Sequence, residues 1–211
     1  MSVIGTKKTL NFHKYSLKIS DILSNWKIII PVIFSLAGIL TGCFTGKGEG
    51  RLFQAVTGYF NNVVLGRDAM SLGSDFIFYL ILPSIFLTVV FFLGLSVFGS
   101  LITNAVPLVY GYLIGCVSYH LYNEYTLKGL AYCIIMIFPY GVFCLLAIVL
   151  CCRESISMSE YIIKSISKTG KFLNYGFNTF YKSFFRNFIF VIIASAVKTV
   201  LEYLFGSLFA F

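Results

Sequence analysis

The sequence predicts an all-α integral membrane protein, a single bundle of about five transmembrane helices with short amphipathic helices at the membrane interface. Its 211 residues are 58% hydrophobic and only 11% charged, whereas about a quarter of a typical soluble domain is charged. The apolar residues also come in blocks of about twenty, the length of helix that crosses a hydrocarbon core of roughly 30 Å. We therefore expect residues 1–211 to form one transmembrane domain.

Five apolar blocks mark the expected spans, at about 27–46, 76–99, 102–122, 129–152 and 187–210. The longest remaining segment, 153–186, is too short to bury a hydrophobic core of its own. The first block starts late and is longer than the apolar region of a signal peptide, so no cleaved leader is expected. The short connection between the second and third blocks predicts that these two helices are antiparallel neighbours.

Basic residues gather before the first block and in segment 153–186. These two segments together carry eleven basic and three acidic residues, whereas the loop at 47–75 and the turn at 123–128 together carry four of each. Five spans place both basic segments on one side, and the positive-inside rule makes that side cytoplasmic. We expect a cytoplasmic N-terminus, an extracytoplasmic C-terminus and no nucleic-acid partner, because no basic surface extends beyond the membrane margin.

Three segments outside the blocks show apolar residues at helical spacing. Residues 15–26 fit either a helix on the membrane surface or a simple lead-in to the first span. The outer loop, 47–75, is expected to lie on the membrane, to cover the bundle or to contact a partner. In the cytoplasmic segment 153–186, Ser157 and Glu160 have the spacing of a capping box. We therefore expect a basic amphipathic helix there, held on lipid or offering a docking surface.

Small residues and prolines inside the blocks predict how the helices pack. Two blocks carry glycines at a spacing of four, namely Gly38, Gly42 and Gly46 in the first and Gly111 and Gly115 in the third. Such glycines let two helix backbones approach closely, which matters because lipid provides no hydrophobic drive for helix association. Helix kinks are expected at Pro83, Pro107 and Pro139.

The stretch "ASAVKTVLEYLF" places Lys198 and Glu202 inside the last apolar block. On insertion scales a single charge near the bilayer centre costs about 2.5–3.5 kcal/mol, so two unpaired charges would make this span marginal. A spacing of four puts both side chains on one helix face, and we expect an ion pair, with Ser195, Thr199 or a hydroxyl from another span. The pair fits a proton or ion relay, an anchor for helix packing or a contact with a partner's helix. Few other polar groups lie at mid-membrane, which favours the last two roles.

The sequence contains no constellation typical of an enzyme or a metal site. All six cysteines lie within or at the ends of the blocks, and none has a C-x-x-C spacing. The histidines are His13 and His120, and Ser118 does not share a helix face with His120. We therefore expect no catalytic residues, no cofactor and no metal.

Several short stretches resemble the stage II sporulation protein M family. They are "FFLGLSVFG" followed by Pro107, "GYLIG", "IFPYGVFCLLAIVL" with a serine-rich stretch after it, and "ASAVKTVLEYL" ending near Glu202. This chain departs from the family pattern at two positions. The family leads us to expect a basic residue where this chain has Tyr110, and no lysine at the position of Lys198.

The resemblance implies a multi-pass protein of the bacterial cell membrane that acts without catalysis. It implies a scaffold for extracytoplasmic peptidoglycan hydrolases, the partners being of the stage II sporulation protein D and P type. That assembly remodels peptidoglycan during engulfment of the forespore in sporulation, although the family also has members outside sporulation. The alternative is a permease or ion-coupled transporter component that uses Lys198 and Glu202.

Overall fold

The computed structural model describes residues 26–45, 54, 58, 72–166 and 177–205, and no strand occurs among them. The elements are α2 (Trp26–Thr45), α4 (Leu72–Gly94), the short α5 (Gly99–Ile102), α6 (Ala105–Tyr132), the π-helical turn η3 (Cys133–Ile137), α7 (Phe138–Ile166) and α8 (Phe177–Phe205). The expectations for residues 15–25 and for nearly all of the outer loop fall outside the described residues.

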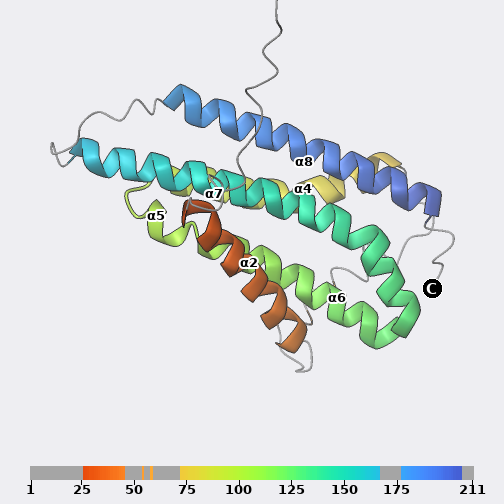
Figure 1. Cartoon of the computed structure of the whole chain (residues 1–211). Helices are drawn as coiled ribbons and strands as arrows, with labels where there is room; N and C mark the ends of the chain where they lie inside the picture. The colour runs from red at the N-terminus through yellow and green to blue at the C-terminus, as the bar shows by residue number, and fades with distance from the viewer. Residues whose placement is uncertain (1–25, 46–53, 55–57, 59–71, 167–176, 206–211) are drawn as a thin grey trace, which may run out of the picture.

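Four helical runs of the described chain are long and apolar enough to cross a membrane, and one of them, Gly99–Ile166, has 68 residues. This run contains both α6 and α7, because the chain turns back at Thr126, whose φ of 48° and ψ of −122° are not helical. The result is five membrane-length arms, α2, α4, α6, α7 and α8 (Figure 1). The predicted fold class, an all-α membrane bundle, is confirmed.

The structure corrects the ends of the expected segments. α7 continues to Ile166 and α8 begins at Phe177, so most of segment 153–186 belongs to these two helices and is not a loop with its own helix. Ser157 does not begin a helix, because it lies inside α7. Its hydroxyl donates to the Arg153 carbonyl oxygen one turn earlier at 3.0 Å. The physical reason is that a helix, once formed, continues until a residue interrupts its backbone hydrogen bonds, and no proline lies between Pro139 and Ile166.

The helices pack in an order that differs from their order along the chain. α2 lies along α6, whereas α4 packs chiefly against α7 and α8, which also pack against each other (Figure 1). The second and third spans, expected to be antiparallel neighbours, make only a small contact with each other. α4 and α6 do touch where the ring of Phe86 meets that of Tyr110 at 5.2 Å. α2 and α6 therefore pair although they are not consecutive spans, whereas α7 and α8 are consecutive and also pack together.

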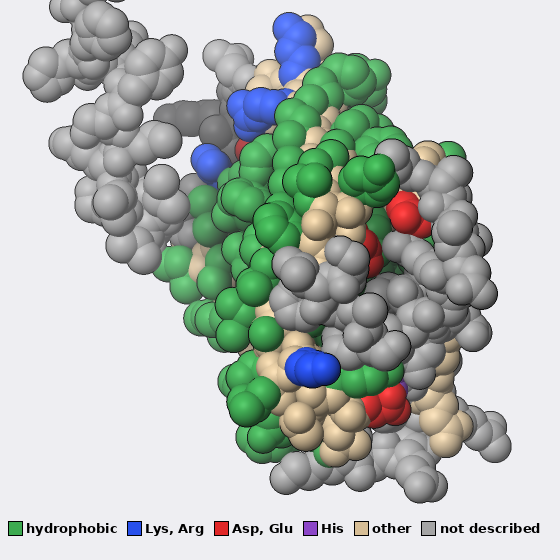
Figure 2. Space-filling view, turned by 90° about the vertical axis from the view of Figure 1, so that its right-hand side faces the viewer, with side chains coloured by type: hydrophobic (Ala, Val, Ile, Leu, Met, Phe, Trp, Pro, Cys, Tyr) green, Lys and Arg blue, Asp and Glu red, His purple; other side chains and the backbone are tan. Residues whose placement is uncertain are grey.

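α7 lies at the centre of the hydrophobic core. Its Cys144, Ile148 and Cys152 are fully buried, and they pack with buried side chains of α4 and α8. Phe91 of α4 stacks on Phe180 of α8 with ring centroids 5.3 Å apart. Many large apolar side chains remain on the outside, as a lipid-facing surface requires. Figure 2 shows them as a broad band running down the molecule, with most of the visible Lys and Arg side chains towards the upper end and one in the lower part.

Candidate functional site

The buried face of α8 carries the two intramembrane charges. The side chain of Lys198 is 3% exposed and that of Glu202 is 15% exposed, with Nζ and Oε2 3.3 Å apart. The structure therefore brings together the two residues that the sequence singled out. Both face neighbouring helices, where a charge is shielded from the hydrocarbon.

Two tyrosines from other helices complete this site, which we call the Lys198 cluster (Lys198, Glu202, Tyr79 and Tyr132). The Tyr132 hydroxyl at the end of α6 donates to Glu202 Oε1 at 3.0 Å, and the Tyr79 hydroxyl of α4 donates to Oε2. The rings of Tyr79 and Tyr132 also lie 5.1 Å and 5.2 Å from Lys198 Nζ, at cation–π distance. Three helices thus supply the groups that compensate the two charges.

Of the three hydrogen-bonding partners that the sequence left open, the hydroxyl from another span is the one found here. Thr199 donates to the Ser195 carbonyl oxygen of its own helix at 2.9 Å, and Ser195 donates to the Tyr79 carbonyl oxygen at 3.5 Å. The Tyr140 hydroxyl of α7 donates to the same Tyr79 carbonyl. Sequence reasoning missed the tyrosines, although a phenol inside an apolar block is a signal, since a buried hydroxyl usually finds a partner.

The cluster has no net charge and joins several helices. Its lysine and glutamate come from α8, its tyrosines from α4 and α6, and Tyr140 ties α7 to the same point. Hydrogen bonds to a charged group contribute about 1.5–3 kcal/mol each. The arrangement is therefore suited to fixing the relative positions of four helices.

The glycine motifs of α2 and α6 face each other. A methyl group added at Gly38 would overlap the Leu108 carbonyl oxygen, and one at Gly115 would overlap that of Ile39. Added atoms at Gly42 and at Gly111 would likewise strike the backbone of the opposite helix. The two backbones are thus in direct contact, as the spacing predicts for small residues in lipid. Gly46 lies outside the described residues.

The prolines divide into two groups. Pro83 lies inside α4, and Pro139 is the second residue of α7, directly after the π-helical turn that widens the backbone. Pro107 lies in the first turn of α6 and not in its interior, at a position where an amide donor has no partner in the helix. Pro31, inside α2, was not singled out from the sequence.

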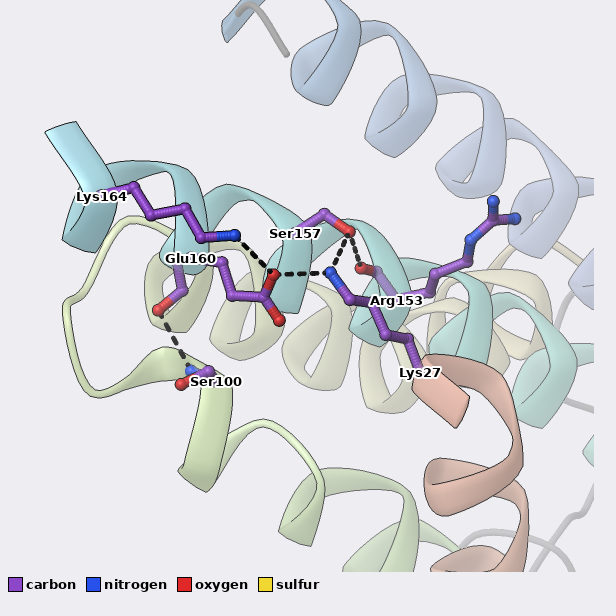
Figure 3. Close-up of polar contacts among 7 residues, drawn as sticks. Lys27, Ser100, Arg153, Ser157, Glu160 and Lys164 are labelled. Carbon is purple, nitrogen blue, oxygen red and sulfur yellow. Dashed lines mark hydrogen bonds and ion pairs between the residues drawn. The ribbon is translucent and has the colours of Figure 1, made fainter. Parts of the chain in front are cut away.

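A second group of charges joins the start of α2 to the far end of α7 (Figure 3). We call it the Lys27 cluster (Lys27, Ser157, Glu160 and Lys164). Lys27 Nζ lies 2.8 Å from Glu160 Oε2 and 3.4 Å from Ser157 Oγ, and Lys164 Nζ lies 3.8 Å from the same Glu160 oxygen. The capping-box residues of the sequence thus serve a contact between helices.

Buried serines in the same part of α7 hold the connection between α4 and α6. Ser159 Oγ donates to the Ser96 carbonyl oxygen at 2.8 Å and accepts from the Ser100 amide at 3.1 Å. Ser155 Oγ donates to the Val90 carbonyl oxygen at 2.7 Å. The serine-rich stretch after the fourth block therefore satisfies backbone groups where α4 ends and α5 begins.

Within the described ranges, no group of three or more His, Cys, Asp or Glu side chains could hold a metal ion. His120 Nδ1 lies 3.6 Å from Glu124 Oε1, one turn away on the same helix. All six cysteines have free thiols, and five of them are buried.

One of the comparisons with known proteins identifies a family for this chain. The family described as Stage II sporulation protein M matches residues 31–205, which include nearly all of the described bundle. Searches of curated proteins and of solved structures found no match. A match over this much of the chain, together with the helices long enough to span a membrane, shows that the protein is a multi-pass membrane protein that belongs to the stage II sporulation protein M family.

Proposed function

We propose that the protein is a non-enzymatic scaffold that holds extracytoplasmic peptidoglycan hydrolases during engulfment in sporulation. The observation that carries the proposal is the family match over residues 31–205. The geometry supports it, because the intramembrane charges contact other helices of the same bundle and form a neutral group. Such a group is suited to stabilising a rigid platform.

We further propose that the N-terminus is cytoplasmic and the C-terminus extracytoplasmic. Along α7 and α8, basic side chains are concentrated in the halves next to the α7–α8 connection, namely Arg153, Lys164, Lys182 and Arg186. Lys27 reaches the same end through its contact with Glu160. The positive-inside rule assigns this end to the cytoplasm, so the Thr126 bend faces outwards.

The partners proposed are hydrolases of the stage II sporulation protein D and P type. The test is co-expression of a tagged form of this chain with each candidate, followed by gentle solubilisation and affinity purification. We expect the hydrolases to be recovered with this chain and not with a multi-span control protein that carries the same tag. Failure to recover either hydrolase while the tagged chain remains monodisperse would contradict the scaffold proposal.

An ion-coupled transporter is the alternative that the sequence left open. The contacts of the Lys198 cluster favour a structural role, because side chains of neighbouring helices contact both charges. Solute or proton flux in reconstituted vesicles tests the alternative. Flux that is present in the parent protein and lost in folded Lys198→Met and Glu202→Gln variants would replace the scaffold by a transporter.

A further inference from the structure

We propose that the Lys27 end of α7 binds the phosphate diester of an anionic phospholipid, with Arg153 as its main ligand. The inference is independent of the scaffold function. It starts from the charges around Lys27. Lys27, Arg153 and Lys164 are cationic, whereas Glu154 and Glu160 are anionic, so this part of the surface carries a small net positive charge.

The depth of Arg153 matches that of a lipid headgroup. Residues 129–152 form an uncharged run of 24 residues that ends α6 and continues through η3 and α7, about 36 Å of helix, which is enough to cross a hydrocarbon core of roughly 30 Å. Arg153 is the next residue. Trp26, at the start of α2, is 53% exposed beside Lys27, and tryptophan favours the interfacial depth.

Arg153 is also the cation of this region that remains available. Its side chain is partly buried, yet its guanidinium makes no hydrogen bond or ion pair within the described part of the chain. Figure 3 shows the guanidinium extending away from the Glu160 carboxylate. A guanidinium presents a fork of donors that fits a phosphate in a bidentate manner.

The neighbouring groups complete a site for an anion. Arg153, Ser157, Glu160 and Lys164 are spaced i, i+4, i+7 and i+11 on α7, so they form one stripe along the helix. The start of α2 lies against this stripe through Lys27. Basic pockets of this kind between membrane helices bind anionic headgroups.

The chain's single tryptophan allows a direct test. The full chain is reconstituted in mixtures of phosphatidylglycerol and phosphatidylcholine, with bromine on the acyl chains of one lipid at a time. Bromine quenches a nearby indole, so quenching of Trp26 measures which lipid occupies the adjacent surface. We expect the parent protein to prefer phosphatidylglycerol by about tenfold, the scale of one charge-assisted contact.

Arg186 provides a matched control for the loss of Arg153. It is exposed on α8 and sits at the same depth, because the adjacent Asn187 donates to Cys151 Sγ at 3.2 Å. Arg153→Gln should reduce the preference to within about twofold of unity, whereas Arg186→Gln should leave it within about twofold of the parent value. Arg153→Lys, which keeps the charge but loses the fork, should fall between them and serves if the glutamine variant does not fold.

Three results would overturn the proposal. The first is that the parent protein shows no preference for phosphatidylglycerol. The second is that Arg153→Gln and Arg186→Gln reduce the preference equally, which indicates diffuse attraction to the whole basic end. The third is that inorganic phosphate abolishes the preference while sodium chloride of equal ionic strength does not. That result would assign the site to a soluble phosphate instead of a lipid.

Discussion

Replacing one member of the Lys198–Glu202 pair should destabilise the bundle unequally. Glu202→Gln leaves a lysine that is 3% exposed without its counter-charge. Lys198→Met leaves a glutamate that is 15% exposed and still accepts hydrogen bonds from Tyr79 and Tyr132. The burial and the partners both predict that the loss of the glutamate is the more harmful change.

The separation of the charges sets the magnitude. At the Nζ–Oε2 distance of 3.3 Å, an effective dielectric constant of about 20 gives an attraction of about 5 kcal/mol before the cost of desolvation. Breaking a buried pair typically costs 3–5 kcal/mol. We expect a loss of about 3 kcal/mol for Glu202→Gln and about half of that for Lys198→Met, because two charge-assisted hydrogen bonds remain in the latter. The double variant should be more stable than Glu202→Gln alone, since it leaves no uncompensated charge.

Thermal and denaturant unfolding in mild detergent measure these free energies for the parent, both single variants and the double variant. The four values form a double-mutant cycle, whose coupling free energy should be about 2 kcal/mol or more. A coupling near zero, or a Glu202→Gln variant as stable as the parent, would refute the view that the pair stabilises the bundle through mutual neutralisation.

Two further predictions use the same unfolding measurement. Gly115→Ala should lower the free energy of unfolding by about 3 kcal/mol, because its methyl group would strike the backbone of α2. The control Gly73→Ala should be neutral or slightly stabilising, because nothing lies within 4 Å of the added atom. Equal effects of the two changes would exclude a tight α2–α6 contact. Thr126→Gly should raise stability by about 1 kcal/mol, because φ is 48°, whereas Asn123→Gly in the helix should lower it by a similar amount. Loss of stability in Thr126→Gly would refute strain at the bend.

Much of the fold could be predicted from local sequence. A run of about twenty apolar residues spans a bilayer as helix whatever its neighbours are, so the five arms follow from composition and length. A lysine and a glutamate four residues apart share a helix face in any helix, so the pairing of Lys198 with Glu202 also follows. Helix ends were less predictable, because the polar segment after Arg153 continues the helix of the preceding span.

The contacts between distant segments were beyond the reach of the sequence. The glycine motifs were visible, but nothing in their spacing says that Gly42 meets Gly115 or that α4 prefers α7 and α8 to α6. The tyrosines that compensate the charges are far from them along the chain and carry no mark of their partner. The same holds for Lys27 and Glu160.

The sequence by itself determined that this chain is a helical membrane protein and where its charges, glycines and apolar runs lie along each helix. The tertiary structure alone decided which helices are neighbours, which groups neutralise Lys198 and Glu202, and which arginine is left without a partner in the described chain. The physical reason is that insertion into lipid depends on the composition of each segment separately. Association within lipid depends instead on the fit of two surfaces and on hydrogen bonds between them, and both arise only when the helices meet.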